Sequence, residues 1–548
     1  MALRHSSSGW RMLFYLCLGG DASHFSKIVR WIGRYLCGNV LFMSARRLNA
    51  ELANELRESA ESVVRVAPRW ATEPHRGIVH FGVGAFHRSH LAVYLDDLAI
   101  NQGGQSGTSS ASHGPRASWS ITGTGVTPTD QRIADVLAAQ DGYYTLVERS
   151  GERANARIIG SIPSFSRAVP DPCATIKLLA DPSTSIVSLT ITEGGYPVRL
   201  GAFDLTESLA SDLVVETPRT TFGIIVAALE QRKTNGLAPF TVLSCDNLPG
   251  NGHVVKMSVL GAATTRSDAL ATWIERNGAF PNGMVDRITP ATTDADRAFV
   301  EDTYGIVDQW PVVCEPFRQW ALEDNFVTDR PRFEDVGVLM TTDVIPYEHM
   351  KLRLLNGSHS ALAYLAALAG IDFVHTAVQD VRIERYIRAL MATEAAPTLT
   401  TPAGVDLVAY QDELVRRFSN PAIADTIARL CLDGTAKMPT FILETLKHQL
   451  RVDGPIDMLV LALAGWCRYL QGRADDGSPI RLSNDPYLDE AREAALASKS
   501  SPRKFLTYRR VFGDSLSMSD RLNERFDAAM HSLTAHGALM TLEQWTPR

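Results

Sequence analysis

The sequence has few cysteines and no clustered metal-binding pattern. Its seven cysteines are scattered over 548 residues, without a CxxC pair or a tight Cys/His spacing. In a chain of this size, an odd and scattered set indicates reduced thiols rather than a disulfide framework, and it argues against a structural zinc site. We therefore expect a cytoplasmic protein that binds no metal.

The chain also lacks an excess of positive charge and a long apolar run. Its formal net charge is −7, which disfavours nonspecific binding to nucleic acid or to an anionic membrane. The apolar run at residues 12–18 is too short to span a bilayer, and no clean small-residue cleavage pattern comes after it. The length is enough for two or three domains. These features leave a small molecule as the expected partner.

The first 42 residues differ in character from the rest of the chain. They are rich in arginine, whereas Met43 opens a segment that reads as an ordinary helical lead-in. We expect residues 1–42 to be dispensable or absent from the native chain.

Residues 77–340 alternate between short β-branched runs and helix-like stretches. Strands are predicted near residues 77–81, 118–124, 185–192 and 240–245, and a Gly/Ser-rich stretch at 103–116 is predicted to be an exposed insertion. Such alternation is typical of a doubly wound α/β domain. We expect a Rossmann-type dinucleotide-binding domain at residues 43–340.

Beyond residue 340 the sequence is dominated by helical patterns. Helices are predicted at residues 351–369, 377–394, 407–418, 422–432, 440–451 and 458–471, with few convincing strands between them. The fold class is therefore α/β, a Rossmann-type domain followed by a mostly α-helical C-terminal domain at residues 341–548.

A glycine turn comes after the first predicted strand. Gly82 and Gly84 lie where a dinucleotide fold lets backbone N–H groups approach a pyrophosphate, but His87 occupies the place of the usual third glycine. Taken alone, this motif fits an ordinary strand-to-helix turn equally well.

Two further loops, at residues 190–196 and 245–252, come after predicted strands and carry polar residues and glycines. Both are expected at the same edge of the sheet. Asn247 and Asn251, taken singly, are residues typical of turns.

The densest polar set lies at residues 347–359. On an α-helix, Glu348, Lys351, Asn356 and His359 would fall within an arc of roughly 140°. An apolar run comes directly after them, so these polar groups enter a core and need partners or a task. Tyr347 and Lys351 also match the Tyr-x-x-x-Lys pair of short-chain dehydrogenases, but the distant and incomplete glycine turn argues against that family.

Taken together, these segments resemble the polyol-specific long-chain dehydrogenase/reductase family. The matching stretches begin at Gly82, Thr190, Ser244, Met284, Val313 and Lys351 and occur in the family's order. The resemblance implies hydride transfer between a mannitol-like sugar alcohol and NAD or NADP, giving a fructose-like ketose, without a metal and by a protein expected to be monomeric.

The resemblance also implies roles for particular residues. It makes Lys351 the general base, Asn247 and Asn356 the amides that hold the reacting oxygen, and Glu348 part of the proton's exit. The residues matching the polyol site are Asp286, His359 and Arg429. A lysine can serve as base near neutral pH only if its pKa is lowered from about 10.4 by desolvation and neighbours. Two amide donors can then stabilise alkoxide charge without zinc.

The expected cofactor is NAD, with NADP an alternative. An acidic residue after the second strand typically binds the ribose diol, and Asp130 is the candidate, although it also suits a Pro-containing turn. The predicted cofactor-binding residues are Gly82, Val83, Gly84, Phe86, His87, Arg88, Asp130 and Glu193.

Two alternatives lie within the same family: a hexuronate reductase acting on fructuronate or tagaturonate, and an arabinitol dehydrogenase. Residue type does not decide between them, because Arg429 could bind a carboxylate or a row of hydroxyls. A third alternative is a nucleotide-binding regulatory protein without catalysis, against which the joint presence of Lys351, Asn247, Asn356 and His359 argues.

Overall fold

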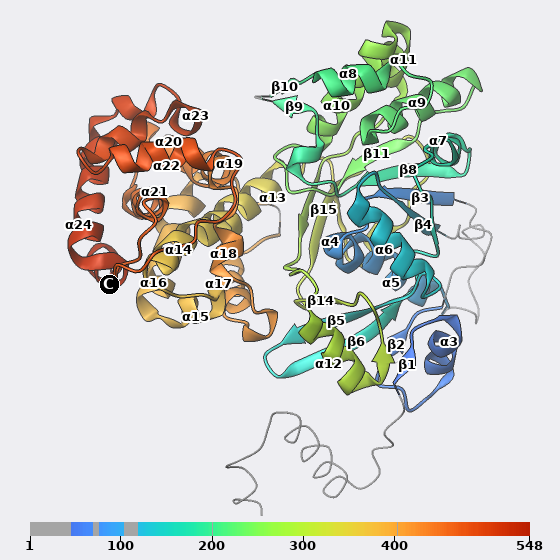
Figure 1. The fold of residues 1–548 in the computed structure, drawn as a ribbon, viewed down its shortest axis with the longest axis horizontal. Helices are drawn as coiled ribbons and strands as arrows, with labels where there is room; N and C mark the ends of the chain where they lie inside the picture. Colours follow the sequence, from blue (N-terminus) through green and yellow to red (C-terminus); the bar gives the residue numbers. More distant parts are fainter. Residues whose placement is uncertain (1–44, 69–75, 104–118, 200, 403, 548) are drawn as a thin grey trace, which may run out of the picture.

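The protein consists of a lobe built on β-sheets and a lobe built of helices. A computed structural model describes residues 45–68, 76–103, 119–199, 201–402 and 404–547. In Figure 1 the sheet lobe runs from blue to green, and the helical lobe, coloured yellow to red, lies beside it. Residues 1–42 and nearly all of the predicted insertion lie outside the described residues.

The central sheet of the first lobe has five parallel strands in the order β11-β8-β3-β4-β7. The first strand is in the middle, and the chain builds outward on one side and then on the other, as in a doubly wound fold. The order reverses between β3 and β8. These strands are β3 (Arg76–Phe81), β4 (Trp119–Thr124), β7 (Ser164–Phe165), β8 (Thr184–Leu189) and β11 (Thr241–Ser244).

Both faces of this sheet are buried. Successive residues such as Ile186 and Val187 point to opposite faces and join different apolar clusters. One face is covered by α5 (Leu91–Gly103) and α6 (Pro128–Ala138). The other is covered by α7 (Cys173–Ala180), α8 (Glu207–Leu213), α9 (Thr221–Thr234), α10 (Asn251–Arg266) and α11 (Asp268–Asn277).

Two smaller sheets complete the first lobe and were not predicted. One contains β14 (Val312–Cys314), β5 (Tyr144–Ser150), β6 (Arg153–Ile159) and β2 (Arg65–Val66), and the other β12 (Gly283–Asp286), β15 (Gln319–Glu323) and β16 (Leu339–Thr341). The remaining elements are α3 (Ala50–Glu58), α4 (Ala85–Ser89), α12 (Asp294–Tyr304) and the pairs β1 (Arg46–Arg47) with β13 (Ile306–Val307) and β9 (Val198–Arg199) with β10 (Ala202–Phe203).

The second lobe packs its helices around two nearly all-buried ones, α14 (Gly357–Leu368) and α21 (Asp457–Leu470). Around them lie α13 (Ile345–Met350), α15 (Val374–Gln379), α16 (Val381–Ala389), α17 (Leu407–Phe418), α18 (Ile427–Leu430), α19 (Gly434–Met438), α20 (Glu444–Arg451), α22 (Leu488–Ala497), α23 (Arg509–Phe512) and α24 (Asp520–Trp545). No helix in the described ranges is long and apolar enough to cross a membrane.

Several predicted helices differ from the observed ones. The predicted helix 377–394 is divided at Asp380, whose side chain caps α16. Of the predicted helix 422–432 only α18 and a short 3-10 turn (Pro421–Ile423) are helical, because Thr426 starts a new helix as its N-cap. Residues 351–356 form a π-helix, η3 (Lys351–Asn356), between α13 and α14. The assumption of a continuous α-helix at residues 351–369 was therefore wrong.

The turn after β3 requires glycine at one position. Gly82 has φ +89°, and a Cβ there would lie 2.1 Å from the Thr190 carbonyl oxygen of the neighbouring strand's loop. Gly84 has φ −75°, and a Cβ there would lie 4.0 Å from its nearest neighbour. Of the two glycines in this turn, only Gly82 is thus irreplaceable on steric grounds.

We predict that Gly82→Ala lowers the free energy of unfolding by about 1–3 kcal/mol, because it combines positive φ with a backbone clash. Gly84→Ser is the matched control in the same turn, since serine suits the N-cap position of α4. Thermal unfolding of the full-length protein measures both. Equal midpoints for the two variants would contradict this account of the turn.

Candidate active site

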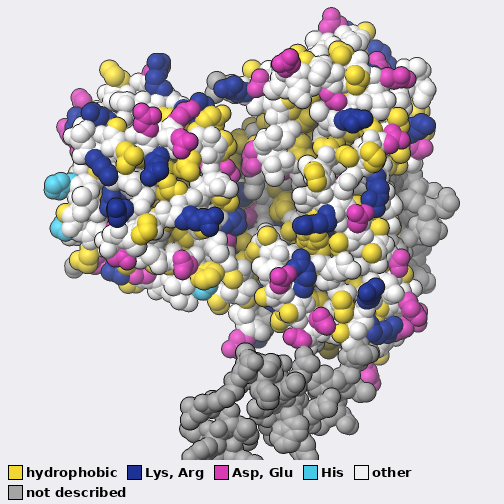
Figure 2. Space-filling model, in the orientation of Figure 1, with side chains coloured by type: hydrophobic (Ala, Val, Ile, Leu, Met, Phe, Trp, Pro, Cys, Tyr) yellow, Lys and Arg dark blue, Asp and Glu magenta, His cyan; other side chains and the backbone are white. Residues whose placement is uncertain are grey.

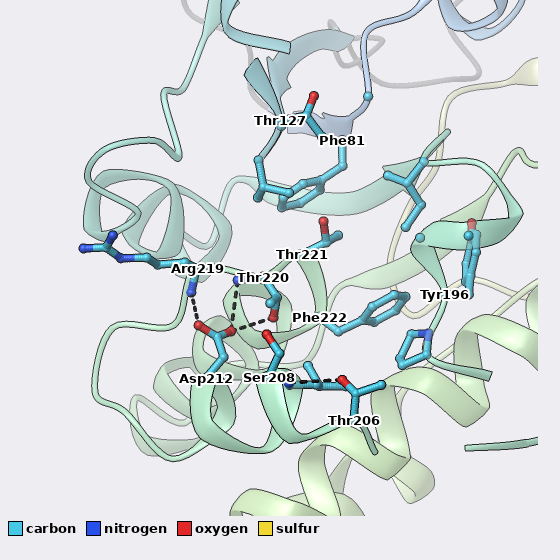
Figure 3. Close-up of a pocket in the computed structure, with 18 of the residues that line it drawn as sticks. Phe81, Thr127, Tyr196, Thr206, Ser208, Asp212, Arg219, Thr220, Thr221 and Phe222 are labelled. Atoms are coloured by element: carbon cyan, nitrogen blue, oxygen red, sulfur yellow. Dashed lines mark hydrogen bonds between the residues drawn. The ribbon is translucent and has the colours of Figure 1, made fainter. Parts of the chain in front are cut away.

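A cavity lies at the carboxyl ends of the central parallel strands, beside the point where the strand order reverses. Its volume is about 1150 Å³, and its wall includes Gly82, Gly125, Asp130 and Thr190. Figure 3 shows it extending from Phe81 and Thr127 at one end to Thr206, Ser208 and Asp212 at the other. This is the place where open α/β sheets bind their ligands.

The predicted cofactor-binding residues divide into two groups. Gly82 and Asp130 line the cavity, and Glu193 lies between two lining residues, in the 3-10 turn η1 (Glu193–Gly195). Asp130 also completes a capping box with Thr127 at the start of α6, which is the turn role that its sequence context allows.

The other five predicted residues, Val83, Gly84, Phe86, His87 and Arg88, do not line this cavity. His87 is buried and stacks on His80 with ring centroids 3.4 Å apart. Arg88 is buried and donates to the Trp310 carbonyl oxygen at 2.5 Å. These side chains fix the turn that carries Gly82.

One buried carboxylate ties together the two loops that were predicted at the same edge of the sheet. Asp246 accepts hydrogen bonds from the backbone N–H groups of Ile191 (2.9 Å) and Thr192 (3.1 Å) and from the Tyr196 hydroxyl (2.6 Å). Asn251 bonds three backbone carbonyls and the Gly283 N–H, which joins the same loop to β12. Asp246 was not predicted from the sequence, although it adjoins the predicted Asn247.

Lys351 is buried where the two lobes meet. Its side chain is on the helical lobe, and its Nζ donates to Oδ1 of Asn247 on the sheet lobe. Burial lowers the pKa of Lys351 to about 8, with Arg417 also lowering it and Asp286, Glu193 and Glu348 opposing the shift. Figure 2 shows the surface hollowed between the lobes.

The π-helix η3 begins at Lys351 and ends at Asn356. Hydrogen bonds in a π-helix join residues five apart, and such turns are frequent at functional sites. Lys351 and Asn356 thus lie about one turn apart. Oδ1 of Asn356 is buried and has no hydrogen-bond partner among the described residues.

Glu348 docks the same helix on the loop after β11. Its Oε2 accepts the backbone N–H of Gly250 at 2.8 Å, and burial raises the pKa of its carboxyl. It also lines a separate groove of about 280 Å³ with Pro249, His349 and Glu444.

His359 presents a neutral imidazole. Its ring stacks on Phe418 at 3.9 Å, and burial lowers its pKa to about 3. Within the described part of the chain its Nε2 has no hydrogen-bond partner. An unpaired buried nitrogen here is a polar group available to a ligand.

Asp286 lies at the end of β12 and binds Arg417, a residue that was not predicted from the sequence.

Arg429 is half-exposed, with its Nε 2.6 Å from Oδ1 of Asp425. A further cation, Lys437, donates to the Leu430 carbonyl oxygen at 3.1 Å, and its pKa is lowered by burial and by the charge of Arg429. No cluster of three or more His, Cys, Asp or Glu side chains suited to a metal occurs in the described ranges.

Comparison with known proteins covers both lobes. A family model described as the mannitol dehydrogenase Rossmann domain matches residues 76–335, and one described as the mannitol dehydrogenase C-terminal domain matches residues 343–534. The chain is 39% identical over 514 residues to mannitol 2-dehydrogenase of Neosartorya fischeri, an alignment covering 92% of this chain and 100% of that relative.

Two solved structures are similar over nearly their whole length. Pseudomonas fluorescens mannitol 2-dehydrogenase, in a ternary complex with NAD and D-mannitol, has a TM-score of 0.81 and 39% identity, covering 91% of this chain and 99% of that chain. A D-sorbitol dehydrogenase in substrate-free form has a TM-score of 0.80 and 33% identity, covering 91% and 100%. The predicted fold class and the predicted family resemblance are confirmed, and the chain belongs to the mannitol dehydrogenase family of NAD-dependent polyol dehydrogenases.

Proposed function

We propose that this chain interconverts a mannitol-like sugar alcohol and the matching fructose-like ketose, with NAD as cofactor, Lys351 as base and no metal. The observation that carries the proposal is the burial of Lys351 against Asn247, which lowers the pKa of the amine to about 8. The similarity to a relative solved with NAD and D-mannitol supports the choice of ligands.

The cavity at the strand ends is suited to a dinucleotide. Close packing at Gly82 leaves backbone rather than side chain facing the cavity, and Asp130 on its wall is our candidate for the ribose diol, which favours NAD over NADP. Glu193, beside this cavity, is close enough to Lys351 for its negative charge to act on the pKa of that lysine, which it raises. The chemistry that NAD supplies when bound is acceptance of the hydride from the alcohol carbon.

Lys351 takes the proton of the alcohol as the C–O double bond forms. A lysine with a pKa near 8 is partly neutral at physiological pH, so its Nζ can accept that proton. Glu348 then passes the proton outward, because its carboxyl contacts Gly250 on one side and lines the groove beside His349 on the other.

Asn247 and Asn356 stabilise the negative charge that develops on the reacting oxygen. Oδ1 of Asn247 is occupied by Lys351, so its NH₂ group is left to donate. Asn356 lies about one π-helical turn after Lys351 on the helical lobe. Two preorganised amide donors replace the metal that other dehydrogenases use.

Asp286, His359 and Arg429 bind the remaining hydroxyl groups. A neutral polyol fits this end better than a uronate, because the charges of Arg417 and Arg429 are each balanced by a carboxylate, that of Asp286 or of Asp425. An arabinitol would use the same contacts. We further propose that the protein acts as a cytoplasmic monomer, with domains at residues 43–340 and 341–548.

We predict that kcat/KM for polyol oxidation rises with pH through a midpoint near 8. Oxidation needs the neutral amine, so the competent fraction grows as Lys351 loses its proton. Lys351→Ala should lower turnover by about 10²- to 10⁴-fold and remove this midpoint, while NADH binding stays nearly unchanged.

Initial rates and NADH fluorescence titrations measure these effects. Lys447→Ala is the control, because Lys447 is a partly exposed lysine of α20 paired only with Glu444 among the described residues. Near-wild-type turnover of Lys351→Ala, or an unchanged pH profile, would remove Lys351 from the proposed role.

We also predict that Asn247→Ala and Asn356→Ala each lower turnover by about 10²- to 10³-fold with cofactor affinity kept. Because both amides serve one oxygen, the double variant should be less impaired than the product of the two single losses. Single-turnover rates of the four proteins measure this coupling. Strictly multiplicative losses would mean that the two asparagines act separately.

A further inference from the structure

Arg417 is a buried arginine whose three guanidinium nitrogens are all hydrogen-bonded to carboxylates. It lies in the last turn of α17, with its side chain 1% exposed. Its two terminal nitrogens bind both oxygens of Asp286 at 2.7 and 2.9 Å, and Nε and Nη2 bind both oxygens of Glu315 at 3.0 and 2.8 Å. One face of the guanidinium lies over the Phe317 ring, 4.0 Å from its centroid.

The two carboxylates come from the sheet lobe and the guanidinium from the helical lobe. Asp286 ends β12, and Glu315 comes directly after β14. Glu315 is itself fixed, because Oε1 accepts the Ile288 N–H at 2.6 Å and its backbone carbonyl oxygen accepts two bonds from Arg287. Arg417 is thus held on a rigid support, and Asp286 is held by Arg417.

The pKa values of the two carboxyl groups that Arg417 binds are shifted in opposite directions. Burial raises the pKa of Glu315, and Arg417 offsets this only in part. For Asp286 burial also acts to raise the pKa, but Arg417, Lys351 and His359 together outweigh it, and the pKa lies below its ordinary value. The charge of Asp286 acts on both Lys351 and His359.

We propose that Arg417 is a positioning residue of this active site, which keeps the Asp286 carboxylate ionised and oriented toward the polyol. The inference rests on the proposed function, in which Asp286 binds substrate. A carboxylate oxygen accepts more than one hydrogen bond, so Asp286 can receive a hydroxyl while Arg417 holds it. Glu315 serves as the anchor of Arg417, and none of the three transfers a proton.

The alternative role for Arg417 is simple attachment of one lobe to the other. If Arg417 only attached the lobes, its loss would lower stability and would affect cofactor binding, polyol binding and turnover alike. If it positions Asp286, its loss would act on polyol binding and would depend on the Asp286 carboxylate. The two roles are separated by a double-mutant cycle with Arg417→Gln and Asp286→Asn, in which kcat, KM for the polyol, NADH affinity and the unfolding midpoint are measured on the full-length enzyme.

We expect Arg417→Gln to lower kcat/KM by roughly 10²-fold, mainly through KM for the polyol, with NADH affinity kept. On the Asp286→Asn background the same change should cost less than threefold, because the group that Arg417 positions has lost its charge. Arg416→Gln is the matched control: Arg416 is the adjacent arginine of α17, 64% exposed and paired with Glu413, and its replacement should leave kcat/KM unchanged.

Equal losses from Arg417→Gln on both backgrounds would overturn the proposal. Should Arg417→Gln fail to fold, Arg417→Lys keeps the charge but loses the bidentate fork, and a roughly tenfold rise in KM is expected. An unchanged KM with only a lower unfolding midpoint would show attachment alone. If neither the wild type nor Arg416→Gln turned over a polyol, the proposed function and this inference would both be overturned. If the wild type were active but the effects of Arg417→Gln and Asp286→Asn were additive, the inference alone would be overturned.

Discussion

The burial of one amine where the two lobes meet is the constraint on which this site depends. Lys351 enters from the helical lobe, where its side chain is buried, and donates a hydrogen bond to Asn247 of the sheet lobe. An isolated buried ammonium is costly, so its pKa falls until the neutral form is accessible. The same burial that disfavours the charge therefore makes the neutral amine accessible near pH 8, which the proposed role of Lys351 as base requires.

Each lobe carries a different part of the candidate site. The parallel sheet places its loops at one edge, and Asp246 ties two of them together beside the cavity at the strand ends. The helical lobe provides a π-turn that carries Lys351 and Asn356. The ion cluster of Asp286, Arg417 and Glu315 joins the lobes. In the proposed function, dinucleotide and polyol meet where the two lobes join.

Much of this arrangement could be predicted from the sequence because it depends on local patterns. The four main strands, α17 and the polar set at residues 348–359 are apparent from periodicity and from polar residues that enter a core. Arg417 could not be predicted in this way, since its partner Asp286 lies 131 positions away. The π-turn was also missed, because apolar spacing does not distinguish it from an α-helix over six residues. The smaller sheets were overlooked because their short strands pair outside the βαβ alternation.

The central claim, that burial lowers the pKa of Lys351 to about 8, can be tested on the amine itself. The direct measurement is an NMR titration of the full-length protein labelled with ¹⁵N at lysine Nζ, with the Lys351 signal identified by its loss in Lys351→Ala. The account predicts a midpoint near 8 for this signal, well below that of the exposed lysines. A midpoint near 10.4, the value of an unperturbed lysine, would contradict it.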